Sequence, residues 1–229
     1  MEKAENYLVT EKIINKYKKV YTGIVYDVLE RLGYPNQSLA NDLKPISNIM
    51  QLAGPAFTIK GRPTTKKDPD NQKLKIGIIN QMKYPCITVI DTDSDTKVAH
   101  FGELTATSSM AHGAIGTLVD GGTRDSKYLL RIGYPTFCRY QCPVEAFGRY
   151  EYEYFQRPVK IRGGLVEFVT VNPGDFIFGD MDGVVVIPSN LTIKVLEMCE
   201  EYFGLENKTR EDFKKGLDPV KVYEKYGRI

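Results

Sequence analysis

Apolar residues recur at helical spacing near the start of the chain. The repeating positions are Val20, Ile24 and Val28, widened by Val25 and Leu29. This period places the side chains on one face of a helix, so residues 10–32 are predicted to be helical, and Gly33 ends the pattern. Thr22 is a good capping residue, so a second helix can begin inside this stretch.

The middle of the chain alternates between short apolar runs and helix-like segments. The apolar runs that predict strands are residues 52–62, 86–93, 115–122 and 134–140, and the helix-like segments are 102–114 and 126–133. Strands that alternate with helices at short spacing are typical of a parallel sheet. An α/β fold is therefore predicted. The polar, lysine-rich segment 63–75 is predicted to be a solvated loop.

The last third of the chain has a different pattern of predicted elements. Residues 158–188 form short β-like runs separated by turn residues, including the tight turn NPGD at 172–175. An amphipathic helix is predicted over 190–203. We expect a single α/β domain over residues 1–205, followed by a helical C-terminal tail over residues 206–229.

Composition narrows the class of protein. The chain has 229 residues, of which 42% are hydrophobic and 26% charged, and its formal net charge is +2. This balance gives no reason to expect a nucleic-acid or membrane partner. No apolar run approaches the roughly 20 residues that span a bilayer, and the charged N-terminal segment lacks the apolar core of a signal peptide. We therefore expect a cytoplasmic protein.

Several well-known motifs are absent from the sequence. Cys138 and Cys142 form a CxxxC pair, but no second pair or histidine cluster accompanies them, so zinc has little support. Free thiols in a reducing compartment are the better interpretation. There is no Walker A sequence, GxGxxG or GxSxG, so nucleotide binding and serine hydrolysis have no support.

Charged side chains gather where the predicted strands end. They are Asp91 and Asp93, Glu103, and the Asp120, Arg124 and Asp125 of the stretch GTLVDGGTRDSK. Ligands of α/β sheets bind at the carboxyl ends of the strands. Gly102 begins a predicted helix, where unpaired N–H groups suit an anion, and a glycine lets a substrate approach the backbone closely.

These residue types suggest a specific chemistry. Asp125 and nearby Glu103 offer hard oxygen ligands, which favour magnesium or manganese over zinc. The planar guanidinium of Arg124 can pair with two oxygens of a carboxylate or enolate at once. Together they describe a site for a 2-oxo acid. The alternative is that Asp120 only belongs to a turn, that Asp125 caps the following helix and that Arg124 is solvated.

Five segments resemble the RraA-like family. They are FGELTATSSMAHGAIGTLVDGGTRD (101–125), TGIVYDVLERLG (22–33), LAGPAFTIKG (52–61), PTFCR (135–139) and VNPGDFIFGDMDGVVVIP (171–188). This family includes the 4-hydroxy-4-methyl-2-oxoglutarate / 4-carboxy-4-hydroxy-2-oxoadipate aldolases and the regulator of ribonuclease E activity A. The resemblance covers about residues 20–205, most of the chain.

The resemblance implies a swivelling β/β/α domain assembled as a homotrimer or hexamer. It implies a divalent-metal-dependent lyase, a class II type aldolase that cleaves a 4-hydroxy-2-oxo acid to pyruvate through a metal-bound enolate. By position, Asp125 would be the direct metal ligand, with Mg²⁺ or Mn²⁺, and Glu103 would act through metal-bound water. Arg124 would bind the substrate oxygens. Backbone amides around Gly102 to Leu104 would hold the substrate carboxylate.

Two positions depart from the pattern of the family. Asn71 matches the asparagine of a family GDN stretch near the site, here altered to PDN, and would contact substrate. The aldolases usually carry an acid where this sequence has Tyr128. We therefore expect an aldolase that can also decarboxylate oxaloacetate, since both reactions share one pyruvate enolate. The alternative is a non-catalytic regulator that binds a ribonuclease or another protein.

Overall fold

The computed structural model describes residues 11–227. Residues 1–10, which hold the start of the charged N-terminal segment, and residues 228–229 lie outside the described part. The helices are α1 (Glu11–Tyr17), α2 (Thr22–Arg31), α3 (Pro69–Ile79), α4 (Glu103–Ala111), α5 (Ser126–Arg131), α6 (Thr192–Lys214) and α7 (Pro219–Tyr226), with a short 3₁₀ turn η1 (Ser189–Leu191). The strands are β1 (Lys44–Pro45), β2 (Leu52–Pro63), β3 (Cys86–Asp91), β4 (Ala99–Phe101), β5 (Ala114–Thr123), β6 (Thr136–Gln141), β7 (Tyr150–Phe155), β8 (Val159–Arg162), β9 (Phe168–Val171), β10 (Phe176–Asp180) and β11 (Gly183–Ile187).

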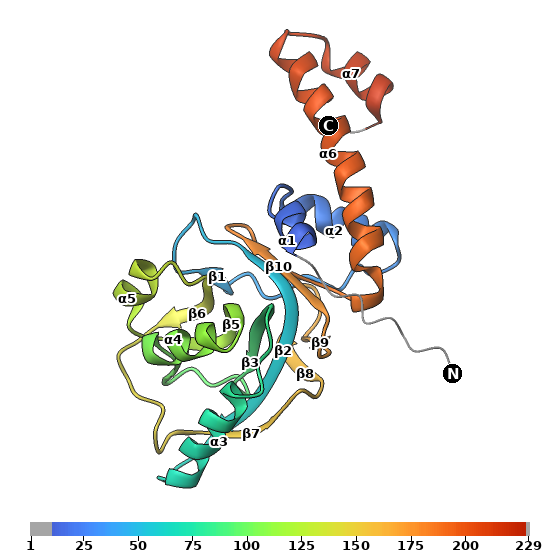
Figure 1. The fold of residues 1–229 in the computed structure, drawn as a ribbon. Helices are drawn as coiled ribbons and strands as arrows, with labels where there is room; N and C mark the ends of the chain where they lie inside the picture. Colours follow the sequence, from blue (N-terminus) through green and yellow to red (C-terminus); the bar gives the residue numbers. More distant parts are fainter. Residues whose placement is uncertain (1–10, 228–229) are drawn as a thin grey trace, which may run out of the picture.

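A mixed sheet forms the centre of the molecule (Figure 1). Its main path runs β1-β6-β5-β3-β2-β10-β11, with β4 beside β5 and β7 beside β2. The pairs β2–β3, β3–β5, β4–β5 and β5–β6 are parallel, whereas β10 joins β2 and β11 in antiparallel register. The predicted parallel core is therefore confirmed, and its strand carboxyl ends share one edge.

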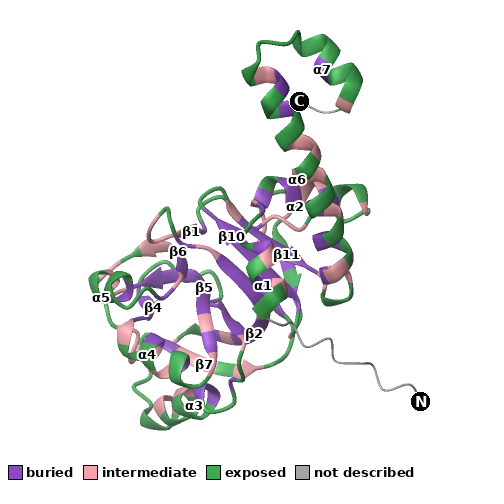
Figure 2. Cartoon of the chain, turned by 45° about the horizontal axis from the view of Figure 1, so that its top comes forward, coloured by how far each residue is buried: buried purple, intermediate pink, exposed green. Residues whose placement is uncertain are grey.

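The central strands are covered on both faces. Every residue of β3 is buried, because its side chains alternate between two apolar clusters. Ile87 and Val89 face a cluster shared with β8–β11. Cys86 and Ile90 face a second cluster, in which apolar residues of α3, α4 and α5 pack against the strands. Burial colours in Figure 2 show the same arrangement, with buried strands between more exposed helices. The result is the predicted β/β/α arrangement.

A third apolar cluster attaches α1, α2 and α6 to the outer face of β10 and β11. The start of α2 is held by a side chain from the sheet. Asp180, at the end of β10, accepts hydrogen bonds from the Thr22 backbone N–H and hydroxyl, each at 2.8 Å. A second helix does begin at Thr22, but Asp180 supplies the side-chain oxygens that bind its first turn.

Two predicted elements differ in the structure. Part of the lysine-rich segment 63–75 is helix α3, whose first turn is capped by the Asp68 carboxylate accepting from Asp70 N–H at 2.9 Å, with Pro69 at the first helical position. Helix α6 extends past the predicted end at residue 203 to Lys214. It crosses the expected domain boundary at 205/206 without interruption.

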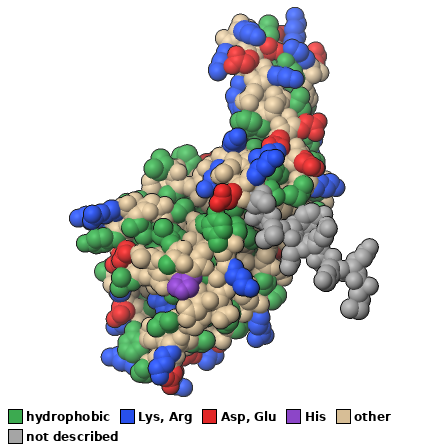
Figure 3. Space-filling view, in the orientation of Figure 1, with side chains coloured by type: hydrophobic (Ala, Val, Ile, Leu, Met, Phe, Trp, Pro, Cys, Tyr) green, Lys and Arg blue, Asp and Glu red, His purple; other side chains and the backbone are tan. Residues whose placement is uncertain are grey.

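The end of α6 and α7 form an arm that projects away from the sheet (Figure 1). Asp212 of α6 joins its two helices by accepting from Lys225 Nζ at 2.8 Å and from the Tyr226 hydroxyl at 2.9 Å. Lys, Arg, Asp and Glu side chains are interspersed over this arm in Figure 3. Within residues 11–227, no helix is both long and apolar enough to cross a bilayer.

Candidate functional site

Two adjacent strand ends build the core of the site. β4 pairs with β5 in parallel, with Phe101 opposite Thr123. The Arg124 backbone N–H donates to the Phe101 carbonyl at 3.0 Å, which extends this pairing by one residue. The structure therefore places Gly102 beside Arg124 and Asp125, although the two segments are separated along the chain by helix α4 and strand β5.

The Asp125 carboxylate lies against the start of α4. Asp125 adopts a left-handed backbone conformation (φ 61°) and precedes α5, but its side chain makes no capping hydrogen bond. Its Oδ2 accepts from the Glu103 backbone N–H at 3.3 Å and lies 3.6 Å from Arg124 Nε. Asp125 thus occupies the N-cap position of α5, as the alternative interpretation has it, but its carboxylate does not cap this helix and is turned toward α4 instead. A positive φ at a non-glycine residue costs about 1–3 kcal/mol and is typical of functional sites.

Gly102 is needed for this close approach. Its backbone is extended (φ −158°), a conformation open to any residue. A Cβ at this position, however, would lie 2.7 Å from Asp125 Oδ2. Gly102 is also the N-cap of α4 and leaves the helix without a side-chain cap. Apart from the Glu103 N–H, which donates to Asp125, the first-turn N–H groups of α4 therefore remain suited to an anion.

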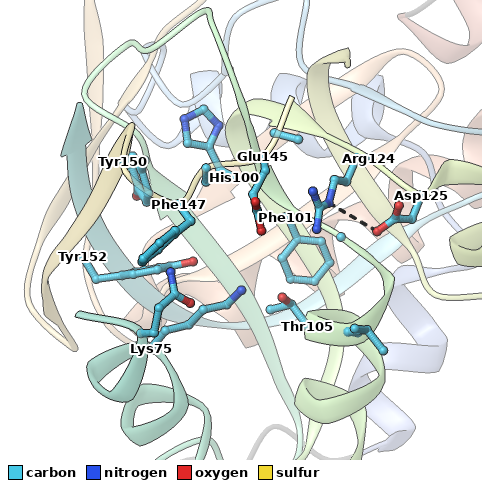
Figure 4. A pocket seen from close by; sticks show the side chains of 15 residues that line it. Lys75, His100, Phe101, Thr105, Arg124, Asp125, Glu145, Phe147, Tyr150 and Tyr152 are labelled. Carbon is cyan, nitrogen blue, oxygen red and sulfur yellow. Dashed lines mark ion pairs between the residues drawn. The ribbon is translucent and has the colours of Figure 1, made fainter. Parts of the chain in front are cut away.

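A hollow of about 160 Å³ opens beside this carboxylate. It is smaller than the roughly 300–1,000 Å³ of sites for drug-sized ligands, which suits a small acid. Its walls come from α3, from β4 and the start of α4, from Arg124 and Asp125, and from β7 and the segment that leads into it. The lining residues are Gln72, Lys75, Ala99, His100, Phe101, Gly102, Leu104, Thr105, Arg124, Asp125, Glu145, Ala146, Phe147, Tyr150 and Tyr152 (Figure 4).

Of the six predicted site residues, four line the hollow: Gly102, Leu104, Arg124 and Asp125. The Glu103 side chain does not line it. Its carboxylate accepts from the Thr107 hydroxyl at 2.7 Å, one turn along α4.

Asn71 also lies outside the lining. Its side-chain amide pairs with the backbone of Tyr152, donating at 2.8 Å and accepting at 2.9 Å. Asn71 thus attaches α3 to β7, two elements that carry other lining residues. A contact between Asn71 and substrate remains a prediction.

Sequence reasoning missed several lining residues, among them Lys75, Glu145, Tyr150 and Tyr152. Burial raises the pKa of both tyrosines, which keeps the phenols protonated. Burial lowers the pKa of Lys75, and the Arg124 charge adds to this effect. No short motif marks these residues, because they converge only when α3 and β7 pack beside β4.

His100 supports the site from within the fold. It is buried, its Nε2 lies 3.0 Å from Asp95 Oδ2, and its Nδ1 accepts from the Gly122 N–H at 3.1 Å. Burial lowers its pKa, and the neighbouring Asp95 carboxylate only partly offsets this. His100 is therefore neutral near pH 7 and fixes the position of β4 rather than exchanging protons.

The other strand-end carboxylates form structural ion pairs. Asp120 is buried and accepts from Arg162 at 2.9 Å (backbone N–H) and 3.0 Å (Nε). Asp91 and Asp93 share the ammonium group of Lys60, at 2.9 and 2.8 Å. None of these three carboxylates lines the hollow.

The residues present fit a cation that keeps most of its own water. No group of three or more His, Cys, Asp or Glu side chains able to hold a metal occurs within the described part of the chain. Magnesium needs no such group, since one or two carboxylates and substrate oxygens commonly hold it. The Asp125 side chain is 41% exposed, and among residues 11–227 its polar contacts are the two long ones described above. Its oxygens can therefore accept a hydrated Mg²⁺ or Mn²⁺.

The fold and this site define an α/β domain with stacked β layers and an Arg-Asp pair at the carboxyl edge of its parallel strands. Residues 22–186 match the RraA-like family, described as Aldolase/RraA. The chain belongs to the RraA-like family.

Two relatives illustrate the similarity. Protein DlpA of Legionella pneumophila is 32% identical over 168 residues, which are 72% of this chain but only 26% of DlpA. The chain thus spans about a quarter of the length of that relative. A protein from Halalkalibacterium halodurans, named as a putative 4-hydroxy-4-methyl-2-oxoglutarate aldolase, is 27% identical over 82% of both chains.

Solved structures share the fold. A protein from work on "novel cellulases from microbes associated with the gut ecosystem" has a TM-score of 0.82 and 29% identity, covering 90% of each chain. Streptomyces coelicolor RraAS2, described as an unusual member of the RNase ES inhibitor RraA family, has a TM-score of 0.73 and 18% identity, covering 88% of this chain and 96% of RraAS2. The RraA-like family therefore includes both named aldolases and named ribonuclease inhibitors.

Proposed function

We propose that this protein is a divalent-metal-dependent lyase that cleaves a 4-hydroxy-2-oxo acid to pyruvate. The observation that carries the proposal is the Asp125 carboxylate, which stands at a helix start without capping it and faces the hollow beside Arg124. A carboxylate and a guanidinium at one edge of a small cavity suit a cation and a 2-oxo acid respectively. The aldolase name of the H. halodurans relative supports the same reaction class.

Different groups of the site would bind the 2-oxo acid oxygens, the substrate carboxylate and the cation. Arg124 is 37% exposed, and its guanidinium can pair with the oxygens of the 2-oxo acid. The Glu103 N–H of the first turn of α4 donates to Asp125, whereas the N–H groups of Leu104 and Thr105, which line the hollow, are open to the substrate carboxylate. Asp125, assisted by Glu103 through water, would hold Mg²⁺ or Mn²⁺. When bound, such an ion supplies Lewis acidity at the 2-oxo group.

Retro-aldol cleavage requires proton transfer, cleavage of one C–C bond and stabilisation of an enolate. The 4-hydroxyl gives its proton to solvent water, and its oxygen becomes the carbonyl oxygen of the second product as the C3–C4 bond breaks. The electron pair of that bond forms the enolate of pyruvate, which takes up a proton from water at C3. Arg124 stabilises the negative charge that develops on the C2 oxygen. One preorganised donor of this kind is worth about 3 kcal/mol. Decarboxylation of oxaloacetate produces the same enolate, so the site would serve both reactions.

The test is pyruvate release from oxaloacetate and 4-hydroxy-4-methyl-2-oxoglutarate, measured with Mg²⁺ or Mn²⁺ and with a chelator. The rate should exceed that of the metal alone and should disappear with the chelator. Asp125→Asn should lower kcat/KM by about a hundredfold or more, because it removes the charge that holds the cation. Asp182→Asn, at an exposed turn, is the matched control and should keep full activity. Pyruvate release that survives the chelator, or no release with either metal, would refute the proposal.

A second candidate is a non-catalytic regulator that binds a ribonuclease. Tyr128 favours it, since this side chain is 53% exposed where the aldolases carry an acid. The inhibitor description of RraAS2 adds support. A regulator would lower RNA cleavage by a purified ribonuclease E, and Asp125→Asn would leave that inhibition intact. A lyase would lose pyruvate release on the same substitution.

A further inference from the structure

The lysine-rich segment before β3 contributes directly to the hollow. The structure folds part of it into α3, and Gln72 and Lys75, three residues apart, project from one face of this helix into the cavity wall. The other lysine of α3 behaves differently. Lys73 is exposed and pairs with Asp70 at 2.7 Å. Lys75 is therefore the α3 lysine placed to meet a ligand.

Lys75 lies half-buried without a counter-ion. The structure gives its ammonium group no hydrogen bond or ion pair to any residue between 11 and 227. The Glu145 carboxylate favours the charged ammonium but lies beyond ion-pair distance, whereas the Arg124 charge acts against the ammonium. Burying a cation is costly unless an anion pairs with it. An anionic ligand group would supply the missing partner.

Lys75 and Arg124 enter the hollow from different sides. Figure 4 shows Lys75 rising from α3 beside Tyr152, while Arg124 points in from the strand end beside Asp125. The charges of Lys75, Arg124, Asp125 and Glu145 cancel. A divalent cation at Asp125 would leave two positive charges in excess, which a dicarboxylate neutralises.

We propose that Lys75 is a specificity-determining residue that binds the distal carboxylate of the substrate and so selects dicarboxylic over monocarboxylic 2-oxo acids. The inference rests on the proposed function for the position of the 2-oxo end at Arg124. Glu145, on the exposed rim, partly offsets the lowering of the Lys75 pKa by burial and by Arg124, without occupying the hydrogen-bonding positions of the ammonium group.

Two acids that cannot be cleaved test the inference without catalysis. 2-Oxoglutarate and 2-oxopentanoate have the same chain length, and only the first has a distal carboxylate; neither has a 4-hydroxyl. Calorimetry with Mg²⁺ should show that the wild-type protein binds 2-oxoglutarate at least about tenfold more tightly, the usual effect of one charge-assisted contact. Lys75→Met should remove this preference and leave 2-oxopentanoate binding within about twofold. Lys75→Arg should retain most of it.

Lys73→Met is the matched control, because it removes a neighbouring charge from the exposed face of the same helix. The preference of Lys73→Met for 2-oxoglutarate over 2-oxopentanoate should equal that of the wild type. In the kinetic assay, Lys75→Met should raise KM for oxaloacetate while changing kcat less. Three results would overturn the inference. They are an unchanged preference of Lys75→Met for 2-oxoglutarate, equal binding of both acids by the wild type, and binding of neither acid. A binding preference without any pyruvate release would refute the proposed reaction and leave the role of Lys75 intact.

Discussion

At the scale of single residues, the site depends on side-chain directions that a sequence does not contain. The strand-end rule placed Gly102, Arg124 and Asp125 near one another, and the structure brings them together. The rule also named Asp120, but this side chain turns into the fold and pairs with Arg162. A strand alternates its side chains between two faces, so neighbouring positions at one strand end can have opposite roles.

Gly102→Ala tests the close contact with Asp125. The new Cβ would displace the carboxylate from its place 2.7 Å away, without straining an extended backbone. We expect kcat/KM for pyruvate release to fall about tenfold or more, since small displacements of a reacting group have large effects. The melting temperature should change little.

Gly77→Ala provides the control for Gly102→Ala. Gly77 lies in α3, and a Cβ there would meet nothing within 4 Å. This change should leave activity intact and stabilise α3 slightly, because alanine favours helix over glycine. Equal activity in the wild type and Gly102→Ala would show that the position of Asp125 does not limit the reaction.

At the scale of elements, helices with one apolar stripe were predictable and α3 was not. Its residues are mostly polar, and burial is confined to Ile78 and Ile79 at its end. The Asp68-Pro69 start signal was present, but no periodic apolar face followed it. The packing of α3 depends on contacts such as the Asn71 side chain with the Tyr152 backbone, which join segments far apart in sequence.

The start of α2 gives a prediction at this scale. Asp180→Ala removes the acceptor of the Thr22 N–H and hydroxyl and of the Asp182 N–H. Loss of a capping side chain in a buried position should lower the free energy of unfolding by about 1–3 kcal/mol. Urea denaturation measures this change. The Asp182 side chain is exposed, so Asp182→Ala should change the free energy of unfolding by less than about 0.5 kcal/mol. Similar losses of stability in the two variants would contradict the capping role of Asp180.

At the scale of the whole molecule, the sequence predicts the α/β class but not the complete sheet. Alternating runs identify β3, β5 and β6 as parallel neighbours, because local connections favour this pairing. The antiparallel pairing of β10 with β2 joins Phe176 to Pro55 across more than half the chain. Such a contact depends on how three apolar clusters fill space together, which no local pattern encodes.

The stability of the whole molecule should depend on pH through His100. Its pKa in the folded protein is below the value of about 6.5 in an unfolded chain, because burial of the ring beside Tyr150 lowers it. The Arg139 charge adds to this effect, and the Asp95 carboxylate only partly offsets it. The unfolded state therefore takes up the proton first as pH falls. The contribution of neutral His100 is complete above pH 6.5 and is lost progressively below it.

Thermal unfolding between about pH 7.5 and 5 measures this effect. His100→Gln should be less stable than the wild type at pH 7.5 and should show a shallower fall in melting temperature on acidification. The exposed His112 provides the control, since His112→Gln should keep the wild-type slope. An identical slope in His100→Gln would show that another group causes the acid sensitivity.

The placement of α3 has a consequence for how such a protein diversifies. The residues proposed for bond cleavage come from the β4–α4 and β5–α5 junctions, whereas Gln72 and Lys75 come from one short helix inserted between β2 and β3. Mutations in that insertion can accumulate without disturbing the reactive end. Exchange of this one peripheral segment, in evolution or by engineering, would therefore change which acids the protein accepts as substrates.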